Sequence, residues 1–111
     1  MSKSRIFAVD FDGTLHDAKY PRIGMPYNAL IQRLIELRNK GDKVILWTCR
    51  EGDFLDLAID WCRDKGLEFD AVNENVPEII EAFGGDCRKI FANYYIDDLA
   101  IRPEDFRSAI R

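Results

Sequence analysis

Two aspartates, Asp10 and Asp12, directly follow residues 6–9, an apolar and β-rich run that predicts a buried strand. Gly13 comes next and lets the chain turn sharply. Two like charges this close repel each other unless a cation offsets them, and Mg²⁺ is usually held by a few carboxylates beside a phosphate. One carboxylate near the cation can attack phosphorus, and the other can protonate the leaving group and then activate water. The pair therefore predicts magnesium-assisted chemistry on a phosphate ester.

The rest of the sequence alternates predicted strands and helices. Strands are expected over residues 6–9, 44–47, 69–72 and 90–96, and helices from Pro26 to Gly41 and over residues 53–65, 77–83 and 103–110. Strands separated by helices imply a mainly parallel sheet with helices on both faces. We therefore predict a single α/β domain over residues 1–111, with no internal repeat or linker.

Ligands of such a sheet bind at the carboxyl ends of its strands, so the polar residues that follow the strands should converge. Those residues are Asp10 and Asp12, then Thr48, Cys49 and Arg50, then Asn73, Glu74 and Asn75, and finally Asp97 and Asp98. The Thr48 hydroxyl and the next backbone N–H groups can hold phosphate oxygens. Arg88 and Lys89, just before the fourth strand, can bring positive charge to the same phosphate. Acids, a hydroxyl and a cation at one sheet edge suit phosphoryl transfer.

In order and context, these motifs resemble the four motifs of the haloacid dehalogenase (HAD) superfamily across residues 5–98. Asp10 and Asp12 match the first motif, Thr48 the second, Lys89 the third, and Asp97 with Asp98 the fourth. The resemblance implies a Rossmann-like, three-layer α/β/α domain with Mg²⁺ as its cofactor. It implies that Asp10 is the nucleophile, which forms an aspartyl-phosphate.

The resemblance also implies roles for the other site residues. Asp12 would be the acid/base and would give its backbone carbonyl to the metal, as in the phosphatase branch of the superfamily. Asp98 would be the metal carboxylate, with Asp97 beside it. Lys89 or Arg88 would fill the third-motif role. With the phosphate contacts expected above, the predicted substrate-binding residues are Thr48, Cys49, Arg50 and Arg88.

Members of the superfamily usually carry an inserted cap domain. Here the loop of residues 15–24 leaves room only for a small flap, and residues 50–89 are taken up by core elements. The chain therefore resembles the capless type. An open site suggests either a bulky substrate or a site closed by another subunit of a homo-oligomer.

Composition narrows the function classes. The net charge is -4 and no basic stripe is present, which argues against a nucleic-acid partner. No apolar stretch approaches the ~20 residues of a membrane span, and the run before Asp10 is too short for a signal peptide. Three cysteines, an odd number, fit a reducing compartment, so a cytoplasmic location is expected.

No arginine lies six residues after any cysteine, which excludes a cysteine-based phosphatase loop, and no Cys/His cluster suggests zinc.

Several of these residues also have a purely structural interpretation. The aspartates could belong to ordinary turns, Thr48 could cap the following helix, and Arg50 could pair with Glu51 or Asp53 at the surface. Arg88 and Lys89 could face solvent as a pair. In the flap, His16 is expected to be solvated, and Lys19 and Arg22 to lie on the exposed surface.

The sequence as a whole predicts a magnesium-dependent phosphohydrolase that releases inorganic phosphate from a phosphomonoester through Asp10. The alternatives are a non-enzymatic phosphoacceptor or phosphate-binding regulatory domain, and a phosphotransferase that uses the same site. Receiver domains carry their phosphoacceptor on a later strand, whereas the third strand here ends in Asn73, which disfavours that arrangement.

Overall fold

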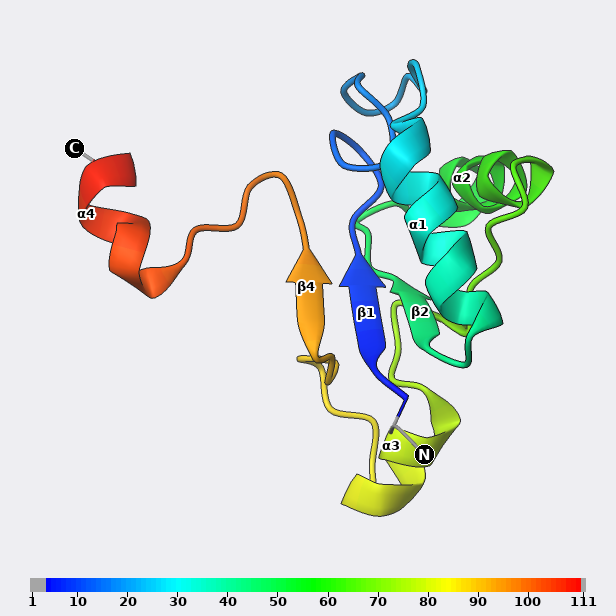
Figure 1. The fold of residues 1–111 in the computed structure, drawn as a ribbon, viewed down its shortest axis with the longest axis vertical. Coiled ribbons are helices and arrows are strands. Elements are labelled where there is room, and N and C mark those ends of the chain that lie inside the picture. The colour runs from blue at the N-terminus through cyan, green and yellow to red at the C-terminus, as the bar shows by residue number, and fades with distance from the viewer. Residues whose placement is uncertain (1–3, 111) are drawn as a thin grey trace.

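The computed structural model describes residues 4–110, and its centre is a four-stranded sheet (Figure 1). The strands lie in the order β3–β2–β1–β4. Their bounds are Ile6–Val9 for β1, Lys43–Leu46 for β2, Ala71–Val72 for β3 and Tyr94–Ile96 for β4. Every pairing is parallel, so the predicted parallel α/β fold is confirmed.

Helical segments cover both faces of the sheet and give a three-layer arrangement. They are α1 (Asn28–Asn39) and α2 (Gly52–Asp64) on one face and α3 (Pro77–Phe83) on the other. The 3-10 helix η1 (Pro103–Asp105) and the short helix α4 (Phe106–Ala109) follow β4 and cover neither face. Side chains alternate along a strand, so Phe7 and Val9 of β1 point into a core shared with α1 and α2. Ile6 and Ala8 point to the opposite face, where Ile79 of α3 packs against the second core.

Some predicted elements are shorter in the structure. The fourth strand was predicted from residue 90, but pairing begins at Tyr94. Asn93 explains the difference because its Oδ1 accepts a hydrogen bond from the Ile6 N–H at 2.7 Å and its own N–H donates to the Ile6 carbonyl at 2.8 Å. The first helix begins at Asn28 rather than Pro26, because Pro26 forms a bridge with His16 instead.

The carboxyl ends of the strands lie at one edge of the sheet, as the parallel topology requires. Backbone hydrogen bonds continue past the ends of the strands: the Asp10 N–H donates to the Ile96 carbonyl at 2.9 Å, and the Trp47 N–H donates to the Val9 carbonyl at 2.8 Å. Asp10 therefore sits between the residues that follow β2 and those that follow β4.

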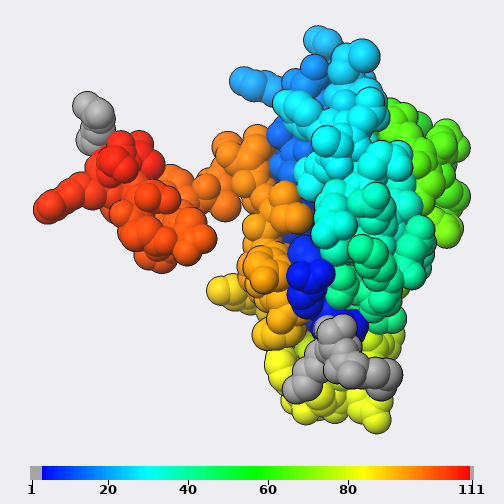
Figure 2. Space-filling model, in the orientation of Figure 1, coloured from blue at the N-terminus to red at the C-terminus, as the bar shows by residue number. Residues whose placement is uncertain are grey.

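The chain beyond β4 leaves the body of the domain, and α4 stands away from the sheet (Figures 1 and 2). Within the described chain, the backbone of α4 lies close to that of η1 and of no other helix or strand. This part of the chain exposes apolar side chains, including Leu99, which is 83% exposed, and Phe106 of α4. None of the helices described for residues 4–110 is both long enough and apolar enough to span a membrane.

Candidate active site

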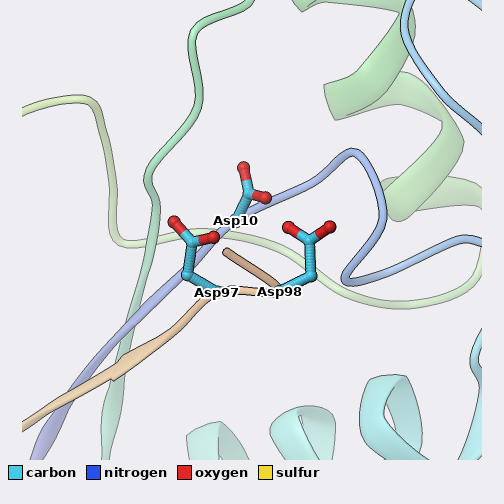
Figure 3. A group of neighbouring side chains, drawn as sticks. All are labelled: Asp10, Asp97 and Asp98. Carbon is cyan, nitrogen blue, oxygen red and sulfur yellow. The ribbon is translucent and has the colours of Figure 1, made fainter. Parts of the chain in front are cut away.

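Three carboxylates meet where β1 and β4 end (Figure 3). Asp10 follows β1, and Asp97 and Asp98 follow β4. One oxygen from each lies within 4.8 Å of the others. This confirms the predicted convergence of the first and fourth motifs, and it places three hard oxygen ligands within reach of one cation.

A hydroxyl from the first motif links two of these carboxylates. The Thr14 Oγ1 accepts the Asp98 N–H at 3.1 Å, and it lies 3.3 Å from the Asp10 Oδ2 and 3.5 Å from the Asp98 Oδ1. The hydroxyl carries one proton, so it donates to one carboxylate at a time. Sequence reasoning gave Thr14 no role, although its buried position four residues after Asp10 makes it the connection between β1 and the fourth motif.

Gly13 leaves the space that Asp98 occupies. Its φ is +79°, a conformation that favours glycine. A Cβ built at this position would lie 2.4 Å from the Asp98 Oδ2. The glycine therefore serves the turn and also the close approach of the Asp98 carboxylate to the backbone.

Asp10 is a weaker acid than an ordinary aspartate. Partial burial, together with the charges of Asp97 and Asp98, raises the pKa of Asp10 to about 6, against an opposing hydrogen bond from the Phe11 N–H. Burial disfavours the ionised form, and so does each neighbouring carboxylate. A divalent cation would remove this penalty.

The Asp12 carboxylate does not join this trio and binds Arg50 instead. Arg50 donates from Nε to Oδ2 at 2.9 Å and from Nη2 to Oδ1 at 2.7 Å. The His16 Nε2 lies 3.0 Å from the Asp12 Oδ1. Partial burial would favour the neutral carboxyl, but the hydrogen bonds from Arg50 and His16 outweigh it and hold the pKa of Asp12 below its ordinary value.

Arg50 has a different role from either one that the sequence suggested. The residue is 2% exposed, and it pairs with Asp12 rather than with Glu51 or Asp53. Its Nη1 donates to the Phe54 carbonyl at 3.1 Å, and its Nη2 donates to the Pro21 carbonyl at 3.1 Å. Arg50 therefore ties the first motif to the flap and to the start of α2, and its charge is already paired with Asp12.

The prediction that His16 is solvated is wrong, because the residue is completely buried. The His16 Nδ1 accepts the backbone N–H groups of Ala18 at 3.1 Å and of Gly24 at 3.0 Å. Since Nδ1 must carry a lone pair to do so, the ring proton sits on Nε2 and is donated to Asp12. His16 therefore fixes the flap on one side and orients Asp12 on the other.

A cavity of about 680 Å³ opens over the first and second motifs. It is lined by Asp10, Asp12, Gly13, Ala18, Lys19, Tyr20, Thr48, Cys49, Arg50, Asp98 and Leu99. A second cavity, of about 270 Å³, is lined by Asp10, Trp47, Thr48, Cys49, Asn73 and Asp97. The structure thus brings Asp10, Thr48 and Cys49 together, as predicted.

Thr48 does not cap α2, whose first turn receives no side-chain cap. Its Oγ1 accepts the Arg50 N–H at 3.1 Å, and its own N–H donates to the Asn73 Oδ1 at 2.8 Å. The hydroxyl proton of Thr48 has no acceptor among the hydrogen bonds of residues 4–110, so it is free to donate to a phosphate oxygen.

Other predicted site residues lie elsewhere. Neither Arg88 nor Lys89 lines either cavity. Both precede β4, whose first residue lies at the far end of the sheet from the aspartates (Figure 1), and the Lys89 Nζ is 6.0 Å from the centre of the Tyr95 ring. Asn75 is buried away from the site, where its side chain binds Asp86 and the Phe91 N–H. Lys19 of the flap was expected only on the exposed surface, and it is exposed, but it also lines the larger cavity.

These features define a three-layer parallel α/β protein with an acidic site at the carboxyl end of its sheet. No family model and no curated protein matches the chain. A conserved protein of Bacteroides thetaiotaomicron, whose structure has been solved, is similar to it. The two chains are 38% identical, the match covers 98% of this chain and 94% of the other, and the TM-score is 0.77. The chain belongs to the same family as that protein.

Proposed function

We propose that this protein is a magnesium-dependent phosphohydrolase of the HAD type, which hydrolyses a phosphomonoester through an aspartyl-phosphate on Asp10. The observation that supports the proposal best is the meeting of Asp10, Asp97 and Asp98 at the ends of two neighbouring strands. Asp12 and Thr48 line the same cavity as Asp10. The set therefore combines metal ligands, a nucleophile, an acid/base and a hydroxyl that can donate a hydrogen bond to a phosphate oxygen.

The donor set fits Mg²⁺. Carboxylate oxygens are the ligands that this ion prefers. The pKa of Asp10 is raised by its burial and, to a smaller extent, by Asp97 and Asp98, and a bound cation would favour the ionised form. The ligands we propose are the carboxylates of Asp10 and Asp98 and the backbone carbonyl of Asp12, with Asp97 beside them. When bound, Mg²⁺ would neutralise phosphate charge and let the anionic substrate approach the anionic nucleophile.

The residues of this chain then divide the reaction into two steps. A carboxylate oxygen of Asp10 attacks phosphorus, the bond to the ester oxygen breaks, and that oxygen either takes the proton of a protonated Asp12 and leaves as the alcohol or leaves as a stable anion. In the second step, Asp12 accepts a proton from water, the water oxygen attacks phosphorus, and inorganic phosphate leaves with Asp10 regenerated. The free Thr48 hydroxyl donates to a phosphate oxygen in both steps.

The environment of Asp12 suits the second step better than the first. Its pKa is held low by Arg50 and His16, so the residue rests as a carboxylate and is ready to accept a proton from water. Donation to the leaving group requires the protonated form, which this environment disfavours. The site therefore favours leaving groups that depart as stable anions.

The experiment is to incubate the purified full chain with a broad panel of phosphomonoesters, with Mg²⁺ and with excess chelator. We expect phosphate release with Mg²⁺, none with chelator, and a fall of several orders of magnitude in Asp10→Asn, which keeps the shape of the side chain and loses its charge. Full turnover in chelator, or near-native turnover of Asp10→Asn, would contradict the proposal. Stoichiometric phosphorylation of Asp10 without turnover would indicate a phosphoacceptor instead.

A further inference from the structure

A phosphate bound in the cavity over Asp10 needs a positively charged side chain to offset its charge, and few residues can supply one. Within the described part of the chain, the cationic residues that line the cavity are Lys19 and Arg50. Arg50 already makes four hydrogen bonds through its side chain, two of them to Asp12, and that side chain is 1% exposed. Because its charge is neutralised by Asp12, Arg50 cannot offset the charge of a substrate.

Lys19 is in the opposite situation. Its side chain is exposed, it lies on the cavity wall between Ala18 and Tyr20, and no ion pair involves it among residues 4–110. An ammonium group on a flexible stem can follow a phosphate group through a reaction as a point charge with three donors.

The flap backbone that carries Lys19 is held in place on both sides. On one side, the His16 Nδ1 accepts the Ala18 N–H at 3.1 Å. On the other, the Lys19 carbonyl accepts the Arg22 N–H at 3.0 Å, and the Tyr20 ring packs 5.2 Å from the Arg50 guanidinium carbon. The base of the Lys19 side chain is therefore positioned over the cavity before any ligand arrives.

We infer that Lys19 is the cation that contacts the scissile phosphate, in place of a residue that precedes β4. The inference rests on the proposed function and assigns the residue that supplies positive charge to the phosphate. The three equatorial oxygens of the transferring phosphoryl group carry the charge of the transition state, and Lys19 approaches them from the flap, while the carboxylate trio lies at the strand ends. The flap thereby supplies a substrate-binding residue of the site.

The test compares Lys19→Met with Arg22→Met and Lys89→Met in the full-length protein with Mg²⁺. Arg22 is the matched control, because it is an exposed cation of the same flap that does not line the cavity. We expect kcat/KM to fall by about 100-fold in Lys19→Met, the size of effect seen when one preorganised donor to a developing charge is removed. Arg22→Met and Lys89→Met should stay within about twofold of wild type, as surface substitutions do.

Two further measurements separate the inference from the function on which it rests. Lys19→Arg should recover part of the lost kcat/KM, and calorimetric titration with inorganic phosphate in the presence of Mg²⁺ should show weaker binding by Lys19→Met but not by Arg22→Met. If wild type turns over and Lys19→Met matches it in both measurements, Lys19 has no such role while the phosphohydrolase stands. A fall in Lys89→Met alone would return the role to the segment before β4. A wild-type protein without turnover that still binds phosphate through Lys19 would overturn only the hydrolase.

Discussion

The Arg50 guanidinium donates two hydrogen bonds to the Asp12 carboxylate, at 2.9 and 2.7 Å, across 38 residues of sequence. The Arg50 side chain in this two-point contact is only 1% exposed. Such a geometry fixes both the position and the ionisation of a carboxylate. Asp12 is therefore oriented by the fold itself.

Removal of Arg50 should destabilise the protein strongly. Arg50→Met leaves the Asp12 carboxylate without its cation and frees the Pro21 and Phe54 carbonyls, so we expect a loss of about 3 kcal/mol in the free energy of unfolding. The control is Arg33→Met, which removes an exposed ion pair with Glu36 and should cost about 0.5 kcal/mol or less. Denaturant unfolding monitored by circular dichroism measures both, and equal effects would show that the Arg50 contact contributes little.

Alanine at Gly13 should damage the proposed metal site beyond its effect on the backbone. Gly84 is a matched control, because its φ of +76° nearly equals the +79° of Gly13 while a Cβ there would meet nothing within 4 Å. Both substitutions should cost about 1–2 kcal/mol of stability, because alanine is strained at positive φ.

Only Gly13→Ala should weaken Mg²⁺ binding, since its Cβ would displace the Asp98 carboxylate. Isothermal titration with Mg²⁺ distinguishes the two variants. Equal Mg²⁺ affinities would show that Asp98 can move aside without leaving the metal.

The acidity of Asp10 predicts how the stability of the metal-free protein depends on pH. The folded-state pKa of about 6 lies above the ordinary 3.8, so the folded protein binds more protons between these values. Asp10 therefore subtracts stability as pH rises through this window. Asp10→Asn should remove this loss and stabilise the chelated protein at pH 7 by about 1 kcal/mol, which is less than the full change in pKa would give, because solvent reaches the partly buried Asp10 and screens its charge.

Thermal unfolding from pH 4 to 7 in chelator tests this, with Asp56→Asn on the exposed surface of α2 as the control. The Asp56 variant should keep the wild-type pH dependence. If the stability of Asp10→Asn depends on pH in the same way as that of wild type, ionisation of Asp10 does not destabilise the folded protein.

The ion pair of Asp12 predicts a preference among leaving groups. Wild type should hydrolyse aryl phosphates faster than alkyl phosphates, because an aryl oxide leaves without a proton and Asp12 rests ionised. In Asp12→Asn, an aryl phosphate should still phosphorylate Asp10, and the intermediate should accumulate because no base activates water.

The readouts are a burst of phenol release and a mass increase of one phosphoryl group. An alkyl phosphate should label the variant far more slowly. Equal labelling rates with the two substrates, and no accumulated intermediate, would limit Asp12 to supporting the turn or the metal.

Local patterns were enough to predict the parts of the fold that depend on short segments. The apolar run before Asp10 and the glycine after Asp12 predicted a strand and a turn, and parallel topology then predicted that Asp97 and Asp98 would meet Asp10. The contacts that spacing could not reveal join distant segments. Nothing in the sequence shows that Arg50 reaches back to Asp12.

Burial was also hard to predict for polar residues of the flap. His16 is polar and lies in a loop, which suggested exposure, yet two backbone N–H groups and one carboxylate satisfy its ring in the interior. Lys89 was expected near the phosphate because it precedes the strand that ends in Asp97. The chain between α3 and β4 instead keeps it at the amino end of that strand.

The carboxylate trio spans the boundary between β1, which has a strand on each side, and β4, which is an edge strand paired over three residues. Without a cation, the charges repel across the pairing of β1 with this edge strand. With one, the ion would cross-link the edge strand to the centre, so that its binding energy also resists fraying. Metal binding and the pairing of β4 with β1 would then be coupled in one equilibrium, and the slowest amide exchange in β4 would report how often the site is empty.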